Sequence, residues 1–261
     1  MFCLFLTENK QTMPRQMFTD DLWLKLKAIM MAVGIYNKPF LRQTLEGIFY
    51  RLRVGCPWRD LPGIFGNWNA VYKRFNEWSR KEKLMNIFSS LVIDPDLEWE
   101  FIDGSIVKAH QHSSGAAYGQ ERAIGKSVAG NTTKIHMAVD SGGLPIHFSI
   151  TGGEVHDCKE APNLVAELPK ADYVIADRGY DSEDLRTQIK DKGSIPVIPR
   201  KKNSKTGNDD IDWCLYKYRH LVENVFARLK HFRAIATRYD KLKRNYEGSV
   251  ALACAFLWLP M

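Results

Sequence analysis

The spacing of apolar residues changes once along this chain of 261 residues, at Asp94-Pro95-Asp96. Before that point apolar residues recur with the 3.6-residue period of amphipathic helices, and after it they alternate with the period of two that half-buried strands show. A proline between two aspartates also breaks a helix. The change predicts an all-helical domain over residues 19–93 and an α/β domain over residues 94–261. An N-terminal extension, residues 1–18, shows no clear period.

Helical periodicity in the first domain predicts four helices. Thr19 is placed to cap the first of them, and Gly34 to end it. The unit is basic and rich in tryptophan. Two interpretations fit this pattern equally well, a DNA-binding domain and a helical appendage that only packs. The expected helices cover about residues 22–33, 41–53, 69–78 and 83–91.

The second domain is expected to have the element order β-β-β-α-β-α-β-α. The second and third strands are joined by the hairpin signal Asp140-Ser141-Gly142-Gly143. This order predicts an α/β fold, a mixed sheet flanked by helices. Residues 110–131, rich in Gly, Ser, Ala and Gln, are expected to form a mobile loop. The expected strands are 99–107, 134–139, 146–150, 172–177 and 194–198, and the expected helices are 159–168, 182–191 and 216–230.

Composition favours a polyanionic partner. Lys and Arg number 37 against 30 Asp and Glu, and the sequence pI is about 9.1. The five cysteines are scattered and form no Cys-x-x-Cys pair, so neither a zinc ribbon nor a disulfide framework is expected. The apolar run Val250–Leu259 is about half the roughly 20 residues that span a bilayer and is expected to be core. We expect a cytoplasmic, nucleoid-associated protein with no membrane partner.

Two aspartates stand at strands of the expected sheet. Asp103 lies in the hydrophobic first strand, and Asp177 ends the apolar fourth strand next to a glycine turn. A carboxylate at the end of a buried strand is costly unless it is paired or ligates a cation. If the first and fourth strands are neighbours, Asp103 and Asp177 lie side by side.

The helix expected at 216–230 supplies a third carboxylate. At about 100° per residue its apolar residues form one arc, and a narrow polar stripe faces away from them. Solvated ion pairs explain such a stripe as well as a functional face does, when it is considered alone. With the two aspartates, however, Glu223 completes a set of three acids. The stripe consists of Tyr216, Arg219, Glu223 and Lys230.

Three converging carboxylates repel one another and are normally tolerated because they share divalent metal. Hard oxygen ligands suit Mg²⁺, with Mn²⁺ as a substitute. Two ions in one site activate a nucleophilic oxygen and stabilise the leaving oxygen of a displacement at phosphorus. The acids therefore predict metal-dependent phosphoryl transfer on a nucleic-acid backbone.

The sequence resembles the bacterial insertion-sequence transposases of the IS5 and IS4 type. Their signature Tyr-x2-Arg-x3-Glu-x6-Lys is matched by Tyr216, Arg219, Glu223 and Lys230 without a departure. Residues 101–105 resemble the first motif of the family, residues 175–180 resemble the second, and the likeness continues through residues 55–68. It covers roughly residues 19–260. The resemblance implies an RNase H-like catalytic core with Asp103, Asp177 and Glu223 as metal ligands.

The resemblance further implies a transposase that cuts the terminal repeats of an element and joins the 3′-hydroxyls to target DNA. Because two ends are cut and joined together, the active form is expected to be a homodimer. Tyr216, Arg219 and Lys230 are expected to contact DNA phosphates. Glu223 follows Asp177 by 46 positions, a spacing that leaves no room for the large insertion domain of some IS4 relatives; the sequence does not decide between a hairpin and a non-hairpin route.

Other residues carry further hypotheses. Arg178 is expected to hold a phosphate or the carboxylate beside it, and Lys201 and Lys202 lie in a basic loop that suits phosphates as well as it suits solvent. His156 and Asp157 fit DNA contact and ordinary loop hydrogen bonding equally. Two alternative functions remain, a nuclease of the same fold that does not join ends and an inactive DNA-binding relic.

Overall fold

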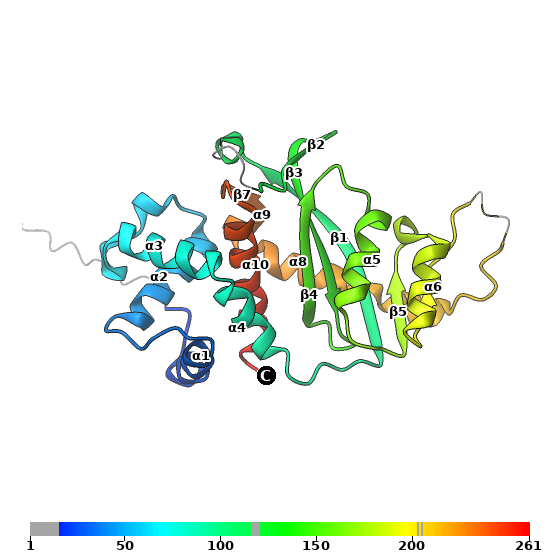
Figure 1. Cartoon of the computed structure of the whole chain (residues 1–261), viewed down its shortest axis with the longest axis horizontal. Helices are drawn as coiled ribbons and strands as arrows, with labels where there is room; N and C mark the ends of the chain where they lie inside the picture. Colours follow the sequence, from blue (N-terminus) through cyan, green and yellow to red (C-terminus); the bar gives the residue numbers. More distant parts are fainter. Residues whose placement is uncertain (1–15, 116–120, 203, 205) are drawn as a thin grey trace, which may run out of the picture.

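The architecture is known from a computed structural model that describes residues 16–115, 121–202, 204 and 206–261. It is an α/β structure in which a mixed sheet is flanked by helices and preceded by a helical region. Figure 1 shows the N-terminal helices at one end of the molecule and the sheet towards the other. Most of the N-terminal extension, part of the loop at 110–131 and two residues of the basic loop lie outside the described residues.

The helical region forms where the sequence predicts it. The Thr19 hydroxyl accepts a hydrogen bond from the Leu22 amide at 3.4 Å and starts the first helix. Gly55 ends the second helix with a φ of 74°, a conformation that glycine adopts without strain. Two short 3₁₀ helices follow, η1 (Trp58–Asp60) and η2 (Gly63–Phe65). The α-helices are α1 (Asp20–Ala32), α2 (Leu41–Val54), α3 (Trp68–Arg80) and α4 (Lys83–Leu91).

The end of the N-terminal extension is held more firmly than its sequence indicates. The amides of Met17 and Phe18 donate to the buried carboxylate of Glu46 at 2.7 and 3.1 Å. The ring of Phe18 is buried. A glutamate on the core side of a helix is unusual, and these two amides are its partners.

The sheet is organised around its central strand β1. Strand β1 pairs antiparallel with β3 and parallel with β5, and the order along the main path is β2-β3-β1-β5-β6. Strand β4 pairs with β3 through the expected hairpin, and β7 pairs with β1. This is the RNase H-like arrangement. The strands are β1 (Trp99–Ala109), β2 (Gly125–Ser127), β3 (Gly130–Val139), β4 (Pro145–Gly152), β5 (Tyr173–Ala176), β6 (Ile195–Val197) and β7 (Thr237–Arg238).

Helices cover both faces of the sheet. Helices α5 (Asp157–Glu167) and α6 (Glu183–Asp191) lie on one face, and α8 (His220–Lys230) lies on the other (Figure 1). Consecutive residues of β1 show the two faces, because side chains alternate along a strand. Gly104 faces Asp157 of α5, whereas Ser105 accepts a hydrogen bond from Lys230 of α8 at 2.7 Å.

Three details differ from the expectation. The single helix expected at 216–230 is divided into α7 (Trp213–Tyr216), the 3₁₀ helix η5 (Lys217–Arg219) and α8. The segment expected to be a loop contains η3 (Gln111–Ser114) and the strand β2, which turns into β3 at Gly130 with a φ of 89°. Strand β7 and the short helix α9 (Arg233–Ala236) also form. These elements depend on tertiary pairing and are too short to show a hydrophobic period in the sequence.

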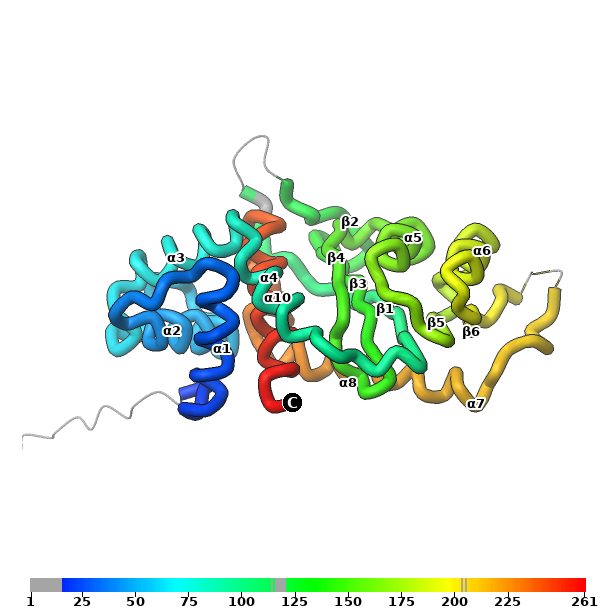
Figure 2. Tube along the Cα trace, turned by 60° about the horizontal axis from the view of Figure 1, so that its bottom comes forward, coloured from blue at the N-terminus to red at the C-terminus, as the bar shows by residue number. Residues whose placement is uncertain are grey.

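The last helix, α10 (Lys243–Trp258), joins the two parts of the molecule. It lies between the N-terminal helices and the sheet in Figures 1 and 2. Almost every residue from Val250 to Leu259 is buried, so the apolar C-terminal run is core as expected. Within the described residues, no helix combines the length and apolarity needed to cross a bilayer. Cys56, Cys158, Cys214 and Cys254 are free thiols.

Aromatic rings from the two parts meet beside α10. The Phe49 ring of α2 is fully buried and lies 4.8 Å from Phe18, 5.6 Å from Phe256 and 6.4 Å from Phe232, measured between ring centroids. Such edge and tilted contacts add to the stabilisation from burial. One core therefore continues from the helical region into the C-terminal helices.

We predict that Phe49→Ala lowers the free energy of unfolding by about 3–5 kcal/mol, because it removes a fully buried ring and leaves a cavity. Phe40→Ala is the matched control, since the Phe40 ring is 72% exposed and its loss costs within ~0.5 kcal/mol. Urea unfolding followed by circular dichroism measures both variants. An equal effect of the two substitutions would contradict the shared core.

Candidate active site

The strand pairing brings Asp103 and Asp177 together. Ile102 and Ala176 are the last register partners of the parallel strands β1 and β5. Asp103 is the next residue of β1, and Asp177 directly follows the end of β5. Asp177 caps the 3₁₀ helix η4 (Arg178–Tyr180), where its carboxylate accepts from the Gly179 amide at 2.7 Å. The sheet therefore sets the two carboxylates at the same edge, as the sequence predicts.

Arg219 lies between Asp103 and Glu223. Its Nη1 donates to Oδ2 of Asp103 at 2.9 Å, and its Nη2 donates to Oε1 of Glu223. The side chains of Arg219 and Asp103 are 22% and 17% exposed, so solvent screens their ion pair only in part. The side chain of Glu223 is 51% exposed. One guanidinium thus connects the carboxylates of β1 and α8.

The ionised form of Asp103 remains disfavoured in spite of this ion pair. Burial raises the pKa of Asp103, the Gly104 amide and Arg219 oppose that rise, and the charge of Asp177 adds to it. Burial also disfavours the charge of Arg219, yet Asp103 and Glu223 raise the pKa of its guanidinium. The acids and the arginine therefore stabilise each other's charged forms.

The other residues of the predicted stripe lie along the same side. Lys230, the last residue of α8, donates to the Ser105 hydroxyl of β1. Tyr216 ends α7 and packs edge-on against Trp213 at 5.7 Å. The 3₁₀ turn between α7 and α8 carries Arg219 towards the sheet. The stripe is therefore assembled from three consecutive short elements instead of one straight helix.

The three remaining predicted contacts lie at the surface. Arg178 is exposed on η4, directly after Asp177. Lys201 and Lys202 are exposed in the loop after β6, where the Lys201 amide donates to Asp181 at 2.8 Å. Arg200 of the same loop forms an ion pair with Asp210. The structure gives Arg178, Lys201 and Lys202 no contact with the acids.

A polar cluster lies on the opposite face of β1; the sequence singles out Asp157 but not its partners Lys134 and His136. Asp157, at the start of α5, forms an ion pair with Lys134 at 3.2 Å and lies 3.5 Å from Nδ1 of His136. The Tyr180 hydroxyl is buried without a hydrogen-bond partner among the described residues. Burial raises the pKa of Tyr180, and the charges of Asp157, Asp103 and Asp177 raise it further. Lys134 and His136 alternate with apolar residues along β3, and this pattern could have indicated two polar side chains on one face of the strand.

Carboxylate oxygens are ligands that hard divalent cations prefer. The carboxylate oxygens of Asp103, Asp177 and Glu223 are donors that such an ion prefers, and the charge of Asp177 already disfavours ionisation of Asp103. Their arrangement is not that of a closed site, since Arg219 stands between two of them. Over the described ranges, no group of three His, Cys, Asp or Glu side chains is close enough to hold a metal ion.

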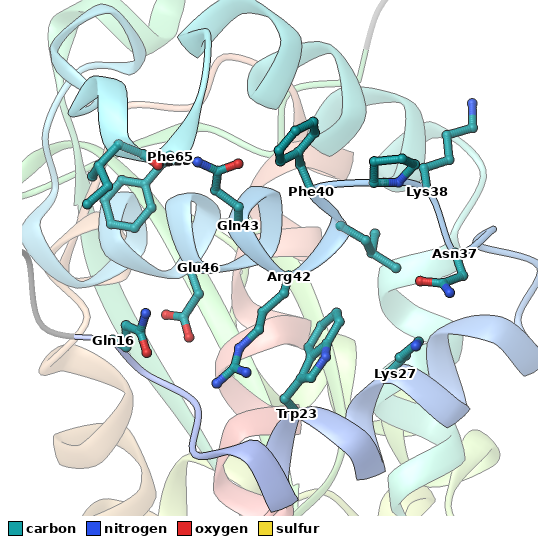
Figure 3. Close-up of a pocket in the computed structure, with 13 residues that line it drawn as sticks. Gln16, Trp23, Lys27, Asn37, Lys38, Phe40, Arg42, Gln43, Glu46 and Phe65 are labelled. Atoms are coloured by element: carbon teal, nitrogen blue, oxygen red, sulfur yellow. Dashed lines mark hydrogen bonds between the residues drawn. The ribbon is translucent and has the colours of Figure 1, made fainter.

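Cavities occur elsewhere in the molecule. One of about 620 Å³ lies between α1 and α2, and Figure 3 shows Trp23, Arg42 and Glu46 around it. Its buried carboxylate, Glu46, already accepts two amides, and Arg42 is bound to Asp20 and to the Phe18 carbonyl. None of the predicted acids lines it. We interpret this cavity as a packing feature of the helical region.

His110 and His112 belong to no metal-binding group in the part of the chain that the structure describes. Their rings stack at 4.8 Å, and His110 also stacks on Tyr239 at 4.5 Å. The two histidines belong to an aromatic column at the end of β1.

Comparison with known proteins gives two family matches. The model described as "Transposase DDE domain" matches residues 101–258, and the model described as "Putative transposase of IS4/5 family" matches residues 18–88. Together they cover the sheet with its flanking helices and the helical region before it.

Individual relatives carry the same kind of name. A Brucella ovis protein named "Putative transposase for insertion sequence element IS6501" is 41% identical over 132 residues, which are 49% of this chain and 98% of the relative. A Neisseria meningitidis serogroup B protein named "Transposase for insertion sequence element IS1106" is 33% identical over 127 residues, 46% of this chain and 44% of that relative. Among solved structures, a piggyBac transposase synaptic complex with hairpin DNA has a TM-score of 0.38 and 12% identity, over 72% of this chain and 50% of that chain.

A second buried acid on β1 shows what Arg219 contributes. Glu100 is 1% exposed, and its Oε1 has no hydrogen-bond partner within the described part of the chain. Burial raises its pKa to about 8, against a smaller opposing effect of Lys192. Between about pH 4.5 and 8 the unfolded chain loses this proton while the folded protein keeps it.

We therefore predict that the free energy of unfolding falls as pH rises through this window, by up to roughly 1.4 kcal/mol per pH unit from Glu100 alone. Glu100→Gln removes that dependence and stabilises the protein near pH 8 more than near pH 5. Glu98→Gln is the control, because Glu98 is exposed on the same segment. Urea unfolding at the two pH values measures the free energy of unfolding of each variant. The same change with pH in both variants would contradict the raised pKa of Glu100.

Proposed function

Because the chain belongs to the family of transposase DDE domains, we propose that it cleaves the ends of an insertion sequence and transfers the 3′-hydroxyl strands to target DNA. The family match covers residues 101–258. Two observations support the proposal: the strand register sets Asp103 beside Asp177, and Arg219 links Asp103 to Glu223. We assign catalysis to residues 94–261 and DNA contact to the helical domain, residues 19–93.

Each residue of the site has a proposed role. Asp103, Asp177 and Glu223 would hold two divalent ions, Mg²⁺ or in its place Mn²⁺. Such ions, when bound, supply Lewis acidity for the attacking and leaving oxygens of an in-line displacement at phosphorus. The three carboxylates would position the ions, and the positive charge of the ions would offset the repulsion between the carboxylates. In the structure described here, Arg219 offsets part of the same repulsion.

The cations of the stripe position the DNA. Lys230 lies against β1 through Ser105, so its ammonium is held close to the strand that carries Asp103. A guanidinium such as that of Arg219 binds a phosphate through two parallel hydrogen bonds. We propose that Arg219, Lys230 and Tyr216 hold the backbone beside the acids. Arg178, Lys201 and Lys202 extend this contact over the exposed surface near Asp177.

Two protomers are proposed to act together as a homodimer, because two ends of one element are cut and joined. Their substrates are the terminal repeats and a target duplex. A nuclease of the same fold shares the acids and cleaves without joining.

We predict that Asp103→Asn, Asp177→Asn and Glu223→Gln each reduce cleavage and joining by at least about 100-fold, since each removes a charge that holds the ions. The substrate is DNA that flanks the gene on both sides, with Mg²⁺, Mn²⁺ or a chelator. Glu98→Gln, an exposed acid outside the site, keeps full activity. Cleavage without joining would favour the nuclease, and activity that survives chelation would exclude the metal mechanism.

The phosphate contacts are tested separately by the salt dependence of binding. In an Asp177→Asn background that keeps the DNA intact, Arg219→Ala and Lys230→Ala are expected to lower the slope of log affinity against log salt by about 0.9 each. Lys190→Ala, an exposed lysine on α6, leaves the slope unchanged, and Glu223→Gln leaves binding largely intact. Equal slopes in all variants would refute the phosphate assignment.

A further inference from the structure

We propose that a cavity between the helical region and the sheet binds an unpaired base of DNA, a role that rests on the DNA substrate proposed above. This junction cavity has a volume of about 830 Å³. Its walls come from η1, α3, the segment after β1, the turn after β7 and the start of α10. The residues that carry the argument are Trp58, Arg59, Trp68, Tyr239 and Asn245.

The cavity presents aromatic faces together with cations. Arg51 lies over the Trp58 ring at 4.9 Å, and Arg59 lies over the Trp68 ring at 5.7 Å. Trp58 is also held by Tyr72, at 5.5 Å between ring centroids. Bases stack on such rings whatever their sequence, and neighbouring arginines strengthen the stack.

Tyr239 provides the most accessible ring. It is 45% exposed, although it lies between the buried residues Arg238 and Asp240. On one face it stacks on His110 at 4.5 Å, with an interplanar angle of 22°. A base that stacks on Tyr239 therefore extends a column that already contains His110 and His112.

Unused polar atoms also line the cavity. Asn245 is 5% exposed, and its Oδ1 has no hydrogen-bond partner among the residues that the structure describes. The Nε of buried Arg51 is likewise unpaired there, although its two terminal nitrogens lie 3.3 Å from the carboxylate of Asp240. A buried acceptor without a partner is unfavourable. The amino group of a base supplies a donor for Asn245, and the amide of asparagine matches the edge of a base.

The position of the cavity favours DNA as the ligand. Strand β1 carries Asp103 in its middle and runs directly into His110, a path of seven residues or roughly 23 Å at 3.3 Å per residue. Exposed Arg59 and Lys241 at the rim favour a phosphate backbone. The bases of an intact duplex are stacked on one another and cannot enter, so the occupant is an unpaired nucleotide.

The test compares three DNA probes by fluorescence anisotropy, without divalent metal so that no probe is cut. They are a blunt duplex, the same duplex with a single-stranded tail, and the same tail without its bases. We expect the tail with bases to bind about 10-fold more tightly than the abasic tail. Tyr239→Ala is expected to bring this ratio to within about 2-fold, whereas Tyr239→Phe keeps it because the ring remains. Tyr36→Ala is the matched control, since the Tyr36 ring is 75% exposed in the helical region and lies outside the cavity.

The outcomes separate this proposal from the proposed function. Equal binding of the two tails by the wild type, or an unchanged ratio in Tyr239→Ala, would overturn the base site while duplex binding still supports a DNA enzyme. Loss of all binding to the blunt duplex at low salt would count against the proposed function itself. Displacement of the tail by a free mononucleotide at equal concentration would assign the cavity to a small ligand and refute the DNA role.

Discussion

The parallel pairing of β1 with β5 is the constraint on which the site depends. It stops at Ile102 and Ala176, so that Asp103 and Asp177 project from neighbouring strands at the same level. On its other side β1 is held antiparallel by β3 over eight register pairs, from Phe101 to Lys108. A slip of one residue in either pairing turns Asp103 to the opposite face, because side chains alternate along a strand. The register therefore fixes which acids meet.

The two acids of β1 are accommodated differently, one by a neighbouring cation and the other by a raised pKa. Asp103 has a cation beside it, supplied by Arg219 from more than a hundred residues further along the chain. Glu100, three residues earlier on the same strand, is buried without such a partner, and its pKa rises to about 8. The comparison indicates that Arg219 is part of the construction of the site as well as a proposed contact to DNA. Any cation that takes its place between the acids has to provide the same compensation.

The sequence predicted the elements that have a strong hydrophobic period. The helices from α1 to α4 and the strands β1, β3, β4 and β5 appear close to the expected residues, and Asp103 lies beside Asp177 because β1 and β5 pair. Elements held by a few tertiary bonds were not predicted, such as β2, β7 and the 3₁₀ turn before α8. The pairing of Asp157 with Lys134 and His136 was missed for a related reason, since these residues come from separate elements and meet only in the folded structure.

The connection between the helical region and the sheet fixes the distance between the acids and the junction cavity. Buried Arg238 donates to the Thr133 hydroxyl of β3 and to the carbonyls of Asp240 and Ala123, and it lies over the Tyr246 ring of α10. Two residues later, Asp240 accepts from Arg51 of α2. A buried arginine with several partners cannot shift without leaving polar groups unpaired. In the complex that we propose, this fixed spacing would let a DNA strand held beside Asp103 present a base to the junction cavity.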